Sequence, residues 1–193
     1  MTVDIQAHAR RGAELGVRFF AENEGKLRDA AARIERALRA GGKLLVFGNG
    51  GSAADAQHVA GEMVGRFRRA RAPLAAVALT TDTSVLTAVA NDFGYEEVFA
   101  RQVRALGRPG DAVLAISTSG NSPSVLRGIE AARSAGLVVL GLAGGDGGRM
   151  AAACDVLLVV PSVETPLVQE VHLAAEHLLC DLVDEAFSEE PRG

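Results

Sequence analysis

Five short runs of almost wholly apolar residues constrain the fold of this chain more than any other feature. They cover residues 43–47, 74–79, 111–116, 137–142 and 156–160. A strand buried on one face alternates apolar and polar residues, whereas a strand buried on both faces is apolar throughout. The runs therefore predict five strands of a parallel sheet that is covered by helices on both sides.

Segments with helical periodicity separate these runs. They cover residues 52–68, 82–105 with a break at 92–94, 122–135, a short turn at 147–152, and 165–187. Strands that alternate with helices in this way are typical of an α/β domain with a doubly wound parallel sheet. We therefore predict a single domain over residues 1–193, with the α/β core in residues 42–193.

Residues 1–41 form an N-terminal extension that we expect to be helical. Apolar residues recur at helical spacing on either side of Asn23 and Gly25, which predicts two helices within residues 3–40. The glycine pair at residues 41–42 should end the second helix, because glycine readily adopts the backbone conformation found just after a helix.

Charge and composition argue against several classes of protein. The formal net charge of −4 does not suit a nucleic acid partner. No apolar run reaches the roughly 18 residues of a membrane span, and the amino terminus lacks the apolar segment of a signal peptide. Cys154 and Cys180 have neither CxxC nor metal-site spacing. We therefore expect free thiols in a cytoplasmic protein that binds neither nucleic acid nor a membrane.

An arginine-rich run at residues 66–71 departs from this average. It fits either a solvated helix end or an anion contact beside a site.

Two polar loops follow predicted strands at the edge where parallel sheets bind ligands. The first, Gly-Asn-Gly-Gly-Ser at residues 48–52, brings backbone N–H groups to the start of a helix, although a tight turn with a cap at Ser52 explains it equally well. The second, Ser-Thr-Ser-Gly-Asn-Ser at residues 117–122, carries four hydroxyls before Pro123. Capping accounts for one hydroxyl but hardly for four, so this loop predicts a phosphate site.

Two helices carry polar residues that suit proton transfer or metal binding. His58 and Glu62 are four residues apart and share a helix face. On the last helix, His172 and His177 point about 140° apart, so they cannot serve one site, whereas Gln169 and His177 could flank an elongated cavity. Each set also fits ordinary solvated positions.

Four segments together resemble the SIS (sugar isomerase) domain, and within it the phosphoheptose isomerases. They are GNGGSAADAQHVAGEMVGRFR at 48–68, TAVANDFGYEEVFARQV at 87–103, ISTSGNSPSVLRGI at 116–129 and VQEVHLAAEHL at 168–178. Their order and spacing match over nearly the whole chain after residue 43, whereas the first 40 residues match only in helical character. The resemblance implies a flavodoxin-like sheet of five parallel strands with an N-terminal helical extension.

The resemblance also implies an aldose–ketose isomerase that converts sedoheptulose 7-phosphate into D-glycero-D-manno-heptose 7-phosphate through an enediol. It implies a homotetramer with active sites at subunit interfaces. Glu62 and His177 would be the acid–base pair, and some family members bind zinc through the counterparts of His58, Glu62, Gln169 and His177, so one Zn²⁺ per subunit is expected. The residues matched to substrate contacts are Asn49, Gly50, Gly51, Ser52, Arg66, Asn91, Asp92, Ser117, Thr118, Ser119, Ser122 and Gln169.

Three alternatives stay open at the level of sequence. Some SIS proteins bind the replication initiator DnaA without catalysis, although the presence of Glu62, His177 and the other potential ligands argues against a purely binding role. Another SIS isomerase would act on a different phosphosugar, and the sequence does not show the pocket depth that selects it. By themselves, Asn91 and Asp92 also fit a simple turn at the predicted helix break.

Overall fold

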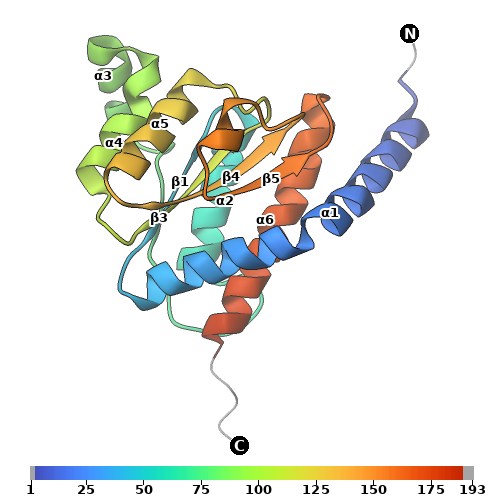
Figure 1. Cartoon of the computed structure of the whole chain (residues 1–193), viewed down its shortest axis with the longest axis horizontal. Coiled ribbons are helices and arrows are strands. Elements are labelled where there is room, and N and C mark those ends of the chain that lie inside the picture. The colour runs from blue at the N-terminus through green and yellow to red at the C-terminus, as the bar shows by residue number, and fades with distance from the viewer. Residues whose placement is uncertain (1–2, 189–193) are drawn as a thin grey trace, which may run out of the picture.

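Five parallel strands form the centre of the fold in this computed structural model, which describes residues 3–188 (Figure 1). They are β1 (Leu44–Gly48), β2 (Ala76–Ala78), β3 (Ala112–Ser117), β4 (Val138–Gly144) and β5 (Val156–Val160). Their order in the sheet is β2-β1-β3-β4-β5, and every neighbouring pair is parallel. The predicted α/β class and strand number are confirmed, although β2 is shorter than the apolar run around it.

Helices cover both faces of the sheet (Figure 1). They are α1 (Ile5–Arg39), α2 (Gly51–Val64), α3 (Thr83–Phe93), α4 (Val98–Leu106), α5 (Pro123–Ser134) and α6 (Thr165–Phe187), with short 3₁₀ helices η1 (Tyr95–Glu97) and η2 (Gly148–Ala152). Buried residues of α1, α2 and α6 form one core with the sheet, and those of α4, α5 and η2 form the other. None of the helices in residues 3–188 is long and apolar enough to cross a membrane.

Strand β1 shows why the strands have no alternating pattern. Leu44 and Val46 pack into the core with α1, α2 and α6, whereas Leu45 and Phe47 pack into the opposite core. Successive side chains of a strand point to opposite faces, and here both faces are covered, so every position must be apolar.

The prediction of two N-terminal helices is wrong, because α1 is one continuous helix of 35 residues. Asn23 does not break it, because its buried side-chain amide donates a hydrogen bond to the carbonyl of Phe19, one turn earlier in the same helix, at 3.0 Å. Gly25 has no atoms near the position that a Cβ would take. Packing against α6 and β5 extends the helix through both residues, and its amino-terminal part projects beyond the sheet (Figure 1).

Three arginines of the arginine-rich run, Arg68, Arg69 and Arg71, pair with acidic residues of α6, whereas Arg66 is exposed. Helix α2 ends at Val64, and the run forms a loop that is tied to the carboxyl-terminal half of α6. Arg71 forms an ion pair with Asp184, and these side chains are 1% and 0% exposed. Arg69 pairs with Asp181. The local charge therefore serves to attach this loop to α6.

Candidate functional site

The strand order reverses between β1 and β3, which places the two predicted polar loops side by side. The chain passes from β1 outward to β2, then returns to β3 and continues through β4 to β5. At such a switch point the loops after the strands diverge and leave a crevice for ligands. The glycine loop (residues 48–52) follows β1 and the serine loop (residues 117–122) follows β3.

Glycines in the first loop are required by the backbone and by a close approach of α6. Gly50 has a φ of 58°, a conformation that strains other residues. A Cβ on Gly51 would lie 2.3 Å from the side-chain nitrogen of Gln169, so Gln169 packs directly on the start of α2. Gly50 is the N-cap of α2, and Ser52 lies buried inside the first turn. The alternative in which Ser52 caps the helix is therefore wrong.

The serine loop leaves the amino end of α5 without a side-chain cap. Ser122 is the N-cap residue, but its side chain makes no capping hydrogen bond. Its oxygen instead accepts from Asn49 Nδ2 at 2.9 Å, which joins the two loops. Uncapped N–H groups and the positive end of the helix dipole favour an anion at this position.

A cavity of about 490 Å³ opens beside the serine loop. Its lining residues are Thr118, Ser119, Asn121, Gly144, Gly145, Asp146, Val163 and Thr165. Two of the predicted hydroxyls therefore face open space, while Ser117 is buried at the end of β3. A larger cavity of about 760 Å³ lies between η1, α5 and η2, and it is lined by none of the predicted site residues.

The predicted acid–base residues meet between α2 and α6. His58 Nε2 lies 2.9 Å from His177 Nε2, and it lies 3.8 Å from Glu62 Oε1. The ring of Phe67 stacks on His177 with centroids 5.4 Å apart. Packing of α2 on α6 thus brings His177 to His58 and Glu62, which lie more than one hundred residues earlier in the sequence.

His172 points away from this cluster, as the helical spacing predicted. Its side chain is fully buried, and Nε2 lies 3.2 Å from the carbonyl oxygen of Ala143 in β4. Burial lowers the pKa of His172 to about 4, and the hydrogen bond to Ala143 only partly opposes this shift. The neutral imidazole therefore joins α6 to the sheet and takes no part in the cluster around His177.

Two buried carboxyl groups behind the cluster were missed at the level of sequence. Glu176 is fully buried, and both of its carboxyl oxygens lack a hydrogen-bond partner among the described residues, as does Asp55 Oδ2. Burial raises the pKa of Glu176 to about 9, and the charge of Asp55 adds to the shift. Burial also raises the pKa of Asp55, although His58 opposes it. One feature of the sequence could have indicated Asp55, since it lies three residues before His58 on α2.

Glu176→Gln should stabilise the protein above neutral pH. The native chain keeps the Glu176 proton up to about pH 9, whereas the unfolded chain releases it near the ordinary value of 4.5, so stability falls as pH rises between these values. A glutamine cannot ionise, and we expect its Tm at pH 8 to exceed that of the native protein by about 5 °C or more. At pH 4 the two proteins should differ little.

Thermal unfolding followed by circular dichroism at both pH values checks this prediction. Glu185→Gln is the control, because Glu185 is exposed on the same helix. A lower Tm for Glu176→Gln at pH 8 would contradict the neutral state of Glu176.

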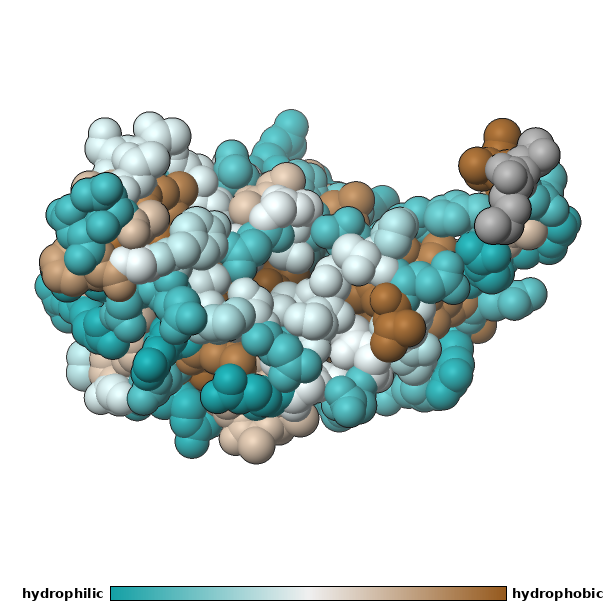
Figure 2. All heavy atoms as spheres, turned by 90° about the horizontal axis from the view of Figure 1, so that it is seen from above, coloured by the Kyte–Doolittle hydropathy of each residue, from teal (hydrophilic) through white to brown (hydrophobic). Residues whose placement is uncertain are grey.

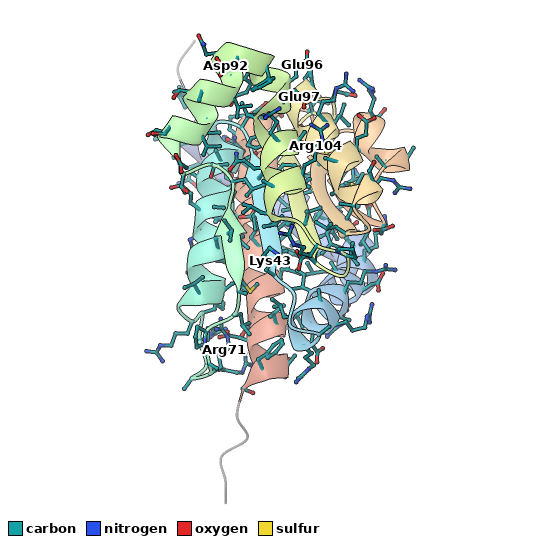
Figure 3. The ribbon with its side chains drawn as sticks, turned by 90° about the vertical axis from the view of Figure 1, so that its left-hand side faces the viewer. Lys43, Arg71, Asp92, Glu96, Glu97 and Arg104 are labelled. Carbon is teal, nitrogen blue, oxygen red and sulfur yellow. The ribbon has the colours of Figure 1, made fainter. Side chains whose placement is uncertain are left out.

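The remaining predicted contacts lie on the exposed rim. Asn91 Nδ2 donates to Asp92 Oδ1 at 2.8 Å, and both residues are exposed at the end of α3. Figure 3 shows Asp92 at the top of the molecule, whereas Arg71 lies at the opposite end. Arg66 is exposed in the loop after α2. No direct contact joins these three residues to the cluster in the described part of the chain.

The crevice and the acid–base cluster lie toward opposite ends of α2. Gly51 begins this helix and Glu62 lies near its end, a separation of about 16 Å at the rise of an α-helix. The same holds for α6, where Gln169 contacts Gly51 and His177 contacts His58. A site within one chain would therefore have to be elongated along the two helices.

The donor types of the cluster suit zinc, but the full predicted ligand set does not converge in one chain. Two imidazole nitrogens that face each other at 2.9 Å need a shared proton or a cation between them, and zinc takes such nitrogens at about 2.0–2.1 Å. Among residues 3–188, no three His, Cys, Asp or Glu side chains form a group that could hold a metal ion. The side chain of Gln169 lies on Gly51 instead.

Known proteins agree with this fold. Residues 8–144 match the SIS domain. The phosphoheptose isomerase of Desulfovibrio desulfuricans is 58% identical over 180 residues, which are 93% of this chain and 86% of that protein. The phosphoheptose isomerase of Rhodospirillum rubrum is 51% identical over 186 residues, which are 96% of this chain and 98% of that protein.

A solved structure also has the same fold over almost its whole length. The phosphoheptose isomerase of Neisseria gonorrhoeae superposes with a TM-score of 0.89 at 45% identity, and the match covers 94% of this chain and 97% of that one. The resemblance carried by the four sequence segments is confirmed, and this chain belongs to the SIS domain family.

Proposed function

We propose that this protein is a phosphoheptose isomerase that converts sedoheptulose 7-phosphate into D-glycero-D-manno-heptose 7-phosphate. Its similarity to phosphoheptose isomerases extends over more than nine tenths of the chain. The observation that carries the proposal is the cluster of His58, Glu62 and His177 between α2 and α6. The other ends of these two helices border the hydroxyl-rich serine loop, which leads into the uncapped amino end of α5.

The serine loop binds the phosphate group. Hydroxyls of Ser117, Thr118, Ser119 and Ser122, together with N–H groups at the start of α5, donate to its oxygens. The residues Asn49, Gly50, Gly51 and Ser52 line the sugar, and Arg66, Asn91, Asp92 and Gln169 are further contacts. Binding energy from the phosphate end positions the reacting carbons, which lie at the other end of the sugar.

Glu62 and His177 transfer the protons. The reaction moves a hydrogen between C1 and C2 and exchanges the carbonyl and hydroxyl groups on these carbons. The Glu62 carboxylate removes the carbon-bound proton to give a cis-enediol and returns it to the neighbouring carbon, while His177 moves protons between the two oxygens. His58 holds the His177 ring in place through their contact at 2.9 Å.

Zinc is part of the proposal as a cofactor. His58, Glu62 and His177 would hold it, Gln169 would join them only if its side chain moved away from Gly51, and the bound metal would polarise the substrate carbonyl. The facing imidazole nitrogens support this assignment. Zinc content of the purified protein, measured by atomic emission, should approach one per chain.

A homotetramer with shared active sites is also part of the proposal. The side chains of His58 and Glu62 are 36% and 23% exposed, yet an enediol must be protected from water. Apolar residues of α2 and α6 are also exposed, among them Val64, Leu173 and Leu178. Seen from above, apolar patches also interrupt the polar surface (Figure 2). A second copy of the chain would cover these residues, and light scattering would give the mass of the assembly.

A cytoplasmic location is proposed for the same protein. Cys154 and Cys180 are both free, and burial raises the pKa of each thiol to about 12, which keeps them unreactive. Free thiols of this kind are usual in a reducing compartment.

Turnover of sedoheptulose 7-phosphate, followed by proton NMR, tests the function. We expect the signals of the aldose phosphate to appear, and deuterium from the solvent to enter at C2, the carbon that receives the proton. The other candidates predict different results. A hexose phosphate isomerase would convert a ketohexose phosphate in preference, and a binding protein would retain DnaA and leave every sugar phosphate unchanged.

A further inference from the structure

Tyr95, in the short helix η1, reaches the crevice between the two loops. Its hydroxyl donates to Asn49 Oδ1 at 2.9 Å. The Asn49 amide nitrogen in turn donates to Ser122 Oγ and to Ser124 Oγ, each at 2.9 Å. A chain of hydrogen bonds therefore runs from η1, through the end of β1, to the start of α5.

The orientation of Asn49 determines what the Ser122 hydroxyl can do. In the observed orientation the amide nitrogen faces Ser122, whose oxygen accepts, so the bond to Asn49 does not use the Ser122 proton. That proton can go either to a ligand or to Ser124 Oγ, which lies 3.4 Å away. In the reversed orientation the amide oxygen would face Ser122 and take that proton. A phenol is a better donor than acceptor, so donation by Tyr95 to the amide oxygen favours the observed orientation.

We propose that Tyr95 is a positioning residue of the phosphate-binding loop. It orients Asn49 so that Ser122 presents its hydroxyl proton to a phosphate oxygen of the substrate. The identity of the ligand rests on the proposed function, whereas the orientation of Asn49 rests on the three hydrogen bonds alone. Hydrogen bonds in such a chain strengthen one another, so loss of the first weakens the last.

A purely structural role does not account for Tyr95. Its side chain is 56% exposed, so its ring buries little apolar area. The preceding helix α3 packs on the core through its own half-buried residues Leu86, Val89 and Ala90, so Tyr95 is not needed to attach it. Ser124, by contrast, is only 3% exposed and is fixed in the first turn of α5. The bond from Tyr95 thus ends on a rigid part of the site.

Tyr95→Phe removes only the hydroxyl, and its effect should be confined to phosphate binding. We expect KM to rise about three- to tenfold while kcat stays within about twofold. The inhibition constant of inorganic phosphate should rise by the same factor as KM. Thr87→Val is the control, because the Thr87 hydroxyl bonds to the carbonyl of Thr83 within α3 and should leave both constants unchanged.

Ser122→Ala provides the second measurement. Since Tyr95 acts through Ser122, adding Tyr95→Phe to Ser122→Ala should weaken phosphate binding no further. An unchanged inhibition constant of inorganic phosphate in Tyr95→Phe would overturn the proposal, and so would a decrease in kcat with no change in KM. The proposal would also be overturned if Tyr95→Phe weakened phosphate binding as much in the Ser122→Ala protein as in the native one. Calorimetry with inorganic phosphate needs no turnover. A native protein that binds phosphate but leaves sedoheptulose 7-phosphate unchanged would therefore contradict the proposed function alone, and one that binds no phosphate would overturn the inference.

Discussion

Glu62→Gln should reduce kcat by at least about a thousandfold, because it removes the proposed base for the carbon-bound proton. The replacement keeps the size of the side chain and its hydrogen-bonding capacity but has no affinity for a proton at neutral pH. KM should change much less, since the proposed phosphate site lies at the other end of α2. Proton NMR of the conversion of sedoheptulose 7-phosphate measures kcat, and calorimetry measures substrate binding.

His177→Gln should reduce kcat by a factor of the same order, because in the proposed mechanism both side chains act on one intermediate. Gln57→Ala is the matched control on α2. Gln57 is exposed, and its side chain bonds only to the carbonyl of Ala53 in the same helix. If either Glu62→Gln or His177→Gln keeps most of the native kcat, the assignment of the acid–base pair is wrong.

Asp184→Asn should destabilise the fold by about 3–5 kcal/mol, because it leaves the buried guanidinium of Arg71 without its counter-charge. Asp184 also accepts from the backbone N–H groups of Arg68 and Arg69, at 2.7 and 2.9 Å. Burial alone would raise the pKa of Asp184, but these donors and Arg71 outweigh it and hold the pKa below its ordinary value. The stabilisation is therefore present at neutral pH and is lost as pH falls through the native pKa.

Urea unfolding at pH 7 measures the loss, and Asp181→Asn is the control. The Asp181 side chain is 21% exposed and pairs with arginines that are exposed themselves, so its replacement should cost at most about 1 kcal/mol. An equal decrease in the free energy of unfolding in the two variants would contradict the larger contribution assigned to the buried pair of Asp184 and Arg71.

The Arg71 ion pair also connects stability to the site. Arg71 donates to the carbonyl of Glu62 at 2.8 Å and to that of Met63 at 2.9 Å. It thereby holds the last turn of α2, which carries the proposed base, against α6. Figure 3 shows Arg71 at the lower end of the molecule, opposite to Asp92.

Strands were predictable from the sequence because burial on both faces demands a continuous apolar run, as β1 and β3 illustrate. The end of α3 at Phe93 was also predictable, because it depends on the adjacent residue Gly94, which has a φ of 88°. The prediction for α1 was wrong because Asn23 and Gly25 have low helical propensity, which long packing against α6 and β5 overrides. The arginine loop was misread because its partners lie on a helix more than one hundred residues later.

Alternating apolar and helical segments determined the α/β class without any coordinates, and the composition of the two polar loops predicted a phosphate-binding edge. These features are local, since each residue reports the burial or the backbone conformation at its own position. Only the tertiary structure decided that His58 faces His177, that Glu176 is buried without a hydrogen-bond partner among residues 3–188, and that Tyr95 donates to Asn49. Such contacts depend on how α2 packs on α6 and on the adjacency of β1 and β3, and sequence spacing does not contain that information.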